Sequence, residues 1–149
     1  ATVALLADVA VVTPSTQFAD THVNMGIGAG DGGQVIWPFL IGVNRAKYYL
    51  MSGDKIGGKE AVEMGLASFI VPEDDQLLPR AIEIASTLAV GAPLAVAASK
   101  LAINAYLRSI SATVFPLAAR AQEETMGSND HQEAIAAFQE KRAPRFTGK

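Results

Sequence analysis

The feature that most restricts the fold is a change of pattern near residue 73. Up to Pro72, short apolar runs alternate with glycine- and proline-rich turns. From residue 75 onward, apolar residues recur at helical spacing almost without interruption. Half of the 149 residues are hydrophobic, which is enough to bury one substantial core. We therefore expect an α/β domain, or a piece of one, in which two or three strands precede a nearly all-helical second half.

The strand candidates all lie in the first half. Residues 3–12, VALLADVAVV, are rich in Val and Leu and predict a buried strand, which a helical turn could precede. Phe18 and Ala19 suggest a short extended piece. The run LASFIVP at 66–72 predicts a strand that stops at its proline.

Helices are expected wherever the apolar spacing follows a period of 3.6 residues. The stretch 75–90 has one apolar face, and the alanine-rich stretch 94–108 predicts a helix that is buried on most sides. Ser128 or Asn129 is expected to cap the last helix. The full set of expected helices is 32–42, with a kink or stop at Pro38, then 44–51, 59–65, 75–90, 94–108, 111–126 and 129–141.

Composition excludes several classes of function. The net charge is −3 and no run of Lys or Arg exists, so nucleic-acid binding is not expected. The chain has no cysteine and only two histidines, so no metal site is predicted. Asp8 interrupts the longest apolar run, which is too short for a bilayer, and no charged segment of signal-peptide type precedes it. We expect a cytoplasmic protein that does not enter a membrane.

Residues 20–33, DTHVNMGIGAGDGG, hold the sharpest candidate for chemistry. Asp31 could orient the His22 imidazole, which would then act as a general base or acid near neutral pH. The alternative is that Asp31 only caps the following helix and His22 is a hydrogen-bonded residue under a loop. The pattern alone leaves both interpretations open.

Two further motifs are less specific. The glycines of this stretch could form an anion-binding nest or an oxyanion hole, but Pro38 and the short helix fit a dinucleotide-binding loop poorly, which favours simple turns. In FQEKR, Phe138 and Lys141 share one helical face and could hold a base ring and a phosphate. A solvated helix end is the alternative.

The order of these segments resembles the enoyl-CoA hydratase/isomerase, or crotonase, family. ADVAVVTPSTQFADTHVNMGIGAGDGGQVIWPFLIGVNRAKYYLMSGDKIGGKEAVEMGLASFIVP is similar to that family's run from "CDI" through "PE", "PGAGGTQRL" and "LTG" to "GLV…VP". AAFQEKRAPRFTGK is similar to its ending "FLEKRKPVFKG".

The resemblance implies the C-terminal part of a crotonase-like spiral of ββα units at 1–92 and a helical oligomerisation region at 93–149. It implies a CoA thioester as substrate, no prosthetic group, and a homotrimer or dimer of trimers. Phe138 and Lys141 would approach the CoA adenine and phosphate, often those of a neighbouring subunit. Members carry both oxyanion-hole N–H groups upstream of the point that corresponds to Ala1, so we expect this chain to need such an N-terminal part.

The two catalytic glutamates of the family's hydratases fall on Thr2 and His22 in this sequence. A hydroxyl cannot replace a carboxylate base, so ordinary two-glutamate hydration is not expected. The spacing of His22 and Asp31 resembles the 6-oxocamphor hydrolase branch, which cleaves a C–C bond of cyclic β-diketones. The leading hypothesis is a hydratase/isomerase-like enzyme that acts through a thioester enolate with His22 and Asp31. The alternatives are a C–C bond hydrolase of β-dicarbonyl compounds and a catalytically silent acyl-CoA-binding protein.

Overall fold

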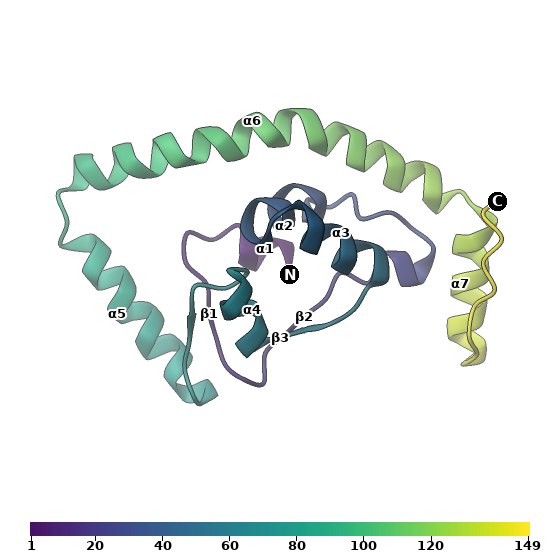
Figure 1. Ribbon diagram of the computed structural model, residues 1–149, viewed down its shortest axis with the longest axis horizontal. Helices are drawn as coiled ribbons and strands as arrows, with labels where there is room; N and C mark the ends of the chain where they lie inside the picture. The colour runs from purple at the N-terminus through teal and green to yellow at the C-terminus, as the bar shows by residue number, and fades with distance from the viewer.

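One long helix organises the molecule. The computed structural model describes residues 1–149, and Figure 1 shows α6 (Pro93–Met126) arching over a small central body. Helix α5 (Leu77–Ala89) extends from the first end of the arch, and α7 (Asn129–Glu140) from the second. Both α5 and α7 therefore lie at the periphery, while the core lies beneath the middle of α6.

The central body consists of short elements. Strand β1 pairs in parallel with β4, with Val11 opposite Phe69, and β2 pairs antiparallel with β3, with Gln17 opposite Gly57. The elements in chain order are α1 (Thr2–Leu5), β1 (Val11–Val12), β2 (Gln17–Phe18), η1 (Val23–Met25), α2 (Gly33–Ile41), α3 (Val43–Ser52), β3 (Ile56–Gly57), α4 (Gly58–Met64), β4 (Phe69–Ile70) and η2 (Asp74–Gln76).

The core is built around α2, because this helix is covered from several sides. Trp37 and Ile56 are fully buried, and α2 packs against α3 and against the middle of α6. Eleven buried residues form one hydrophobic cluster: Leu5, Val12, Phe18, Ile36, Trp37, Ile41, Ala46, Ile56, Ala61, Leu66 and Ala67.

The helices of the first half follow the sequence prediction closely. Helix α2 ends before Gly42 despite Pro38 in its interior, and α3 and α4 end at Gly53 and Gly65, which adopt the left-handed conformation of a helix C-cap. At α7 the predicted cap is confirmed, because the Ser128 hydroxyl accepts a hydrogen bond from the backbone N–H of His131. These capping signals lie within a few residues of the helix ends, so they can be identified from the sequence.

The predicted strand at 3–12 is mostly wrong. Residues Thr2–Leu5 form α1, the helical turn that was expected to precede it, and only Val11–Val12 pair as a strand. Helical hydrogen bonds run from Leu5 N to the Ala1 carbonyl and from Leu6 N to the Thr2 carbonyl. The Val and Leu residues before Val11 do not form a strand despite their strand propensity, because β4 pairs only with Val11 and Val12.

The two helices predicted at 94–108 and 111–126 are one helix. No glycine or proline stands at 109–110, and Pro116 deprives only the Ala112 carbonyl of its donor, so α6 continues through it. The prediction that 94–108 is buried on most sides is also wrong, since Ala118 is the only buried residue of α6. The helix contacts the body along one side only, and α5 buries none of its residues.

No single helix is both long and apolar enough to cross a membrane. Only Asp74–Ala89 together with Pro93–Met126 reaches the necessary length and composition, and that pair is bent by 109° at its junction.

The glycine-rich loop before α2 is held tightly against α6. The backbone N–H of Gly28 donates to the Thr125 hydroxyl at 3.0 Å. At Gly30, a Cβ atom would lie 2.5 Å from Gln122 Cβ and 2.8 Å from the Ala118 carbonyl oxygen. At Gly30 the loop can approach the helix this closely only because the residue lacks a side chain.

Gly30→Ala is therefore expected to destabilise the fold by about 1–3 kcal/mol, since the helix backbone cannot move away as a flexible side chain would. Thermal and urea unfolding measure the effect. Gly127→Ala is the matched control, because its Cβ would make only an ordinary 3.6 Å contact with Glu124 and φ is −84°. Equal stability of Gly30→Ala and the wild type would contradict the close packing.

Candidate active site

The His22 side chain is held by a buried carboxylate. His22 Nδ1 lies 2.6 Å from Asp20 Oδ1, and the same oxygen accepts from the His22 backbone N–H at 3.3 Å. The Asp20 side chain is only 5% exposed and the His22 side chain 24% exposed. Because a carboxylate can only accept, the contact places a proton on Nδ1 and leaves Nε2 as the nitrogen that exchanges protons.

Asp31 lies close by but has different partners. Its Oδ1 accepts from the Gly33 backbone N–H at 3.3 Å, and its Oδ2 accepts from the Thr2 hydroxyl at 3.3 Å. The first contact belongs to the start of α2, where backbone N–H groups lack intrahelical acceptors. Asp31 therefore stabilises the helix start and joins α1 to it.

Asp20, His22 and Asp31 form the His22 cluster. One ligand-type atom from each of the three side chains lies within 4.8 Å of the other two. Neither carboxylate forms an ion pair with a lysine or arginine, and the one ion-pair contact in the cluster joins Asp20 to His22. The cluster thus places two carboxylates beside one imidazole.

Gly33 makes room for this arrangement. A Cβ atom there would lie 2.7 Å from Asp20 Oδ2 and 3.7 Å from Asp31 Oδ1. The first residue of α2 must therefore lack a side chain for the buried carboxylate to keep its place. The N-terminus of α2 also favours negative charge at this point.

The cluster has the residue types of a metal site, although no metal site was predicted from the sequence. Ligand atoms around one small divalent ion, at bonds of about 2.1 Å, lie roughly 3–4 Å apart. Here Nδ1 is already engaged by Asp20 at hydrogen-bond distance. The arrangement fits a proton-transfer group directly, and a metal ion only after the two side chains separate.

The structure thus brings the predicted residues His22 and Asp31 close together, but the orienting partner of His22 is Asp20. The sequence interpretation missed this residue. The available signal was the position of Asp20 two residues before His22. An aspartate side chain often accepts a hydrogen bond from the backbone N–H of the residue two positions later. The Thr2 hydroxyl, for which the resemblance predicts a family glutamate, donates to Asp31.

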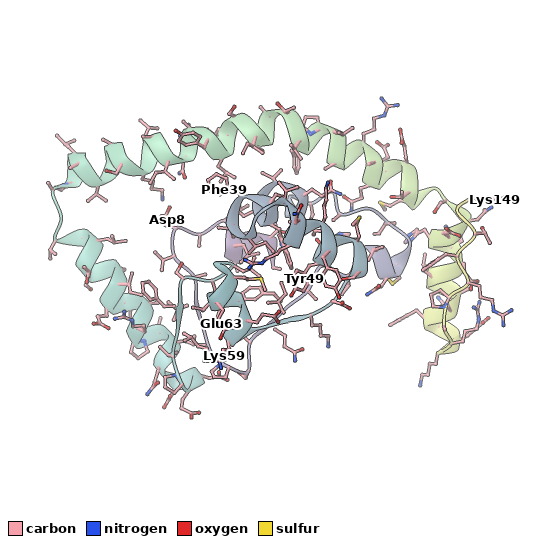
Figure 2. All side chains as sticks on the ribbon, viewed as in Figure 1. Asp8, Phe39, Tyr49, Lys59, Glu63 and Lys149 are labelled. Atoms are coloured by element: carbon pink, nitrogen blue, oxygen red, sulfur yellow. The ribbon has the colours of Figure 1, made fainter.

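An apolar cavity of about 950 Å³ opens beside the residue that follows His22. Val23 lines it, together with side chains from α2, α3 and α6. Phe39 reaches from α2 toward α6 and forms part of its wall (Figure 2). Its volume lies at the upper end of the range for small-molecule sites.

Phe138 and Lys141 are not near the His22 cluster. Helix α7 contacts η1 through its first turn, where His131 Nδ1 lies 2.7 Å from the Met25 carbonyl oxygen. Phe138, which is 77% exposed, and Lys141 stand at the opposite end of that helix. Lys141 has φ 55° and is the one non-glycine residue of the chain in the left-handed region.

Comparison with known proteins shows similarity along the whole chain. A family model described as enoyl-CoA hydratase/isomerase matches residues 1–149. A putative enoyl-CoA hydratase/isomerase of Bacillus subtilis is 33% identical over 97% of this chain and 55% of its own length. A probable enoyl-CoA hydratase of Rhodobacter capsulatus is 37% identical over 100% of this chain and 58% of its own length.

Solved structures agree. A carnitinyl-CoA dehydratase from Mycobacterium avium superposes with a TM-score of 0.89 at 28% identity, covering 98% of this chain and 58% of that one. An enoyl-CoA hydratase/isomerase from Pseudoalteromonas atlantica superposes with a TM-score of 0.87 at 27% sequence identity. That superposition covers 98% of this chain and 58% of the other. The predicted crotonase-like fold is confirmed. The chain spans about half the length of the relatives that it matches.

Proposed function

The chain belongs to the enoyl-CoA hydratase/isomerase family, and from this premise we propose that it forms part of an enzyme that acts on an acyl-CoA thioester through an enolate. The observation that carries the proposal is the His22 ring held at Nδ1 by the buried Asp20. A second support is the large apolar cavity beside Val23.

In this proposal His22 moves the proton. Nε2 removes the α-proton of the thioester or activates a water molecule, and the imidazolium that results is stabilised by Asp20 and Asp31. The thioester oxygen becomes an oxyanion, which backbone N–H donors must stabilise. In agreement with the family resemblance, we assign those donors to chain that would precede Ala1.

The cavity would take the apolar part of the acyl group. It begins at the residue after His22, so a thioester at His22 could place its chain there. Phe138 and Lys141 would hold the CoA nucleotide, with the ring against the adenine and the ammonium against a phosphate. Because both stand at the far end of α7, we propose that they serve the site of a neighbouring copy of the chain.

A direct titration tests the substrate class. We expect CoA to bind the full-length protein and an enoyl-CoA to be turned over. Failure to bind CoA or any acyl-CoA would reject the proposal. Binding of a panel of thioesters without turnover would instead favour the catalytically silent acyl-CoA-binding protein.

Lys141→Gly is expected to change stability and CoA affinity in opposite directions. Glycine relieves the left-handed backbone at φ 55°, which should stabilise the end of α7 by roughly 1 kcal/mol. Removal of the ammonium should weaken CoA binding. Thermal unfolding and calorimetric titration with CoA give the two readouts.

Lys141→Ala is the partner variant, since it removes the charge without relieving the backbone. Both variants should lose CoA affinity to the same extent, and only the glycine variant should gain stability. Unchanged CoA affinity in both variants would remove Lys141 from the nucleotide site.

A second candidate reaction is hydrolysis of a C–C bond in a β-dicarbonyl compound. The observation that favours it is the His22 cluster itself, which offers an imidazole and two aspartates in place of two glutamates. In that reaction His22 would deprotonate water, and the hydroxide would attack one carbonyl. The C–C bond would then break to give a carboxylate and an enolate, which takes up a proton. Cleavage of a cyclic β-diketone without CoA binding would favour this reaction.

We also propose that the chain assembles as a trimer or a dimer of trimers. Large apolar side chains of α5 and α6 are exposed, among them Leu78, Leu94 and Leu101. Exposed apolar surface of this extent is typical of interfaces. Size-exclusion chromatography with light scattering tests the assembly, and a well-folded monomer would contradict it.

A further inference from the structure

The last eight residues, 142–149, form a strap that runs back along α7. The Arg142 guanidinium donates to both oxygens of Glu133, at 2.5 and 2.9 Å. At the other end, the Asn129 backbone N–H donates to the Lys149 carbonyl at 2.8 Å. Figure 2 shows Lys149 back beside the start of α7.

Within the strap, both neighbours of Phe146 are held by carboxylates of α7. The Arg145 backbone N–H donates to Glu133 Oε1 at 2.8 Å, and the Thr147 backbone N–H donates to Asp130 Oδ1 at 2.6 Å. Asp130 also accepts from the Gly148 N–H at 2.8 Å. With both flanking amides held in this way, the backbone at Phe146 has little freedom.

These contacts depend on ionised carboxylates. The hydrogen bonds from Arg142 and from the Arg145 amide lower the pKa of Glu133 to about 2, and those from Thr147 and Gly148 lower the pKa of Asp130. Both groups therefore stay negatively charged across the physiological range. The strap is held by charge, although it lies on the surface.

The Phe146 side chain lines the apolar cavity that begins at Val23. It is 46% exposed, so it stands at the rim of the cavity and not in its interior. The other lining residues belong to helices or to the loop that precedes α2, whereas Phe146 is contributed by the strap, which has no secondary structure. The position of Phe146 therefore depends on the contacts of the strap with Glu133 and Asp130, and not on the packing of a helix against the body.

We propose that Phe146 closes the rim of this cavity and limits the length of the acyl chain that it accepts, with Glu133 and Asp130 holding the strap in the closed position. The inference rests on the proposed acyl-CoA function and assigns the determinant of chain length within it. Its physical basis is that a large aromatic ring occupies space that additional methylene groups would need.

Calorimetric titration of the full-length protein with butanoyl-CoA, octanoyl-CoA and dodecanoyl-CoA tests the proposal. Each additional buried methylene strengthens binding about fourfold. Phe146→Ala should therefore raise the preference for dodecanoyl-CoA over butanoyl-CoA by about fifteenfold, if two more methylenes become buried. Phe146→Trp should lower that preference. Glu133→Gln, which weakens the hold on the strap at Arg142 and Arg145, should shift it in the same direction as Phe146→Ala.

Phe115→Ala is the matched control, because Phe115 is similarly exposed on α6 but does not line the cavity. It should leave the chain-length preference unchanged. Wild-type preference in both Phe146 variants would overturn the inference while leaving acyl-CoA binding intact.

Absence of acyl-CoA binding in the wild type would instead overturn the proposed function. The closure is then tested with the apolar fluorophore 1-anilinonaphthalene-8-sulfonate, whose fluorescence should rise in Phe146→Ala and Glu133→Gln relative to the wild type. Unchanged fluorescence in both variants would show that the strap closes nothing.

Discussion

Replacing His22 with alanine is expected to lower kcat of the full-length enzyme about 100-fold or more, because the variant has no group to take up the proton. CoA affinity should stay at the wild-type level, since Phe138 and Lys141 lie at the far end of α7. Steady-state kinetics with an enoyl-CoA and a CoA titration measure the two quantities. Unchanged turnover would exclude His22 from the reaction.

Two asparagine variants separate the roles of the neighbouring aspartates. Asp20→Asn should also lower kcat by about 100-fold or more at similar KM, because an amide no longer fixes the proton on His22 Nδ1. Asp31→Asn should cost far less, since Asp31 contacts Thr2 and the Gly33 amide.

Proton NMR tests directly whether Asp20 orients the His22 ring, because the ring signals would not change if Asp20 only stabilised the fold. The chain has two histidines, so the ring signals of His22 and His131 can be assigned by mutation. Asp20→Asn should shift the ring-proton resonances of His22, whose Nδ1 loses its carboxylate partner, and leave those of His131 unchanged. Equal effects of Asp20→Asn and Asp31→Asn on kcat would restore the interpretation in which Asp31 orients the ring.

Trp37→Ala is expected to destabilise the fold by about 3–5 kcal/mol, which is a large part of the stability of a typical domain. Trp37 is completely buried on α2, in the centre of the hydrophobic cluster. Truncation leaves a cavity that the surrounding helices can fill only in part. Urea unfolding followed by circular dichroism measures the loss.

Trp37→Phe is the matched comparison. Trp37 Nε1 is buried without a hydrogen-bond partner. Phenylalanine retains an aromatic ring and removes that unpaired donor, which offsets part of the packing loss by about 1–3 kcal/mol. We expect a net cost below about 1.5 kcal/mol. A cost close to that of Trp37→Ala would mean that the indole N–H has a partner after all.

Much of the secondary structure was predictable, because its signals lie within a few residues of the elements that they define. Gly53 and Gly65 end their helices in the left-handed conformation, and Ser128 caps α7 through its side chain. The prediction was wrong where no local signal exists. Nothing at 109–110 breaks a helix, and the length of β1 depends on how far β4 runs beside it.

The candidate site was predictable only in part. The sequence marks His22 as a candidate because it is one of only two histidines and the family resemblance predicts a glutamate at its position. It does not distinguish two nearby aspartates as partners, since the choice depends on where the chain turns between β2 and the start of α2. The backbone directs Asp20 into the interior beside the ring and Asp31 toward Thr2 and the Gly33 amide.

The sequence by itself therefore determined the helices of the first half with their C-caps, the cap of α7, the family and the identity of the proton-transfer candidate. Each of these follows from neighbouring residues or from the linear order of motifs. Only the tertiary structure decided which aspartate contacts His22, which apolar faces are covered, and that Phe146 reaches a cavity whose other walls lie far away in the chain. These outcomes depend on contacts between residues remote in sequence. Spacing along the chain does not encode such contacts, whereas packing in three dimensions does.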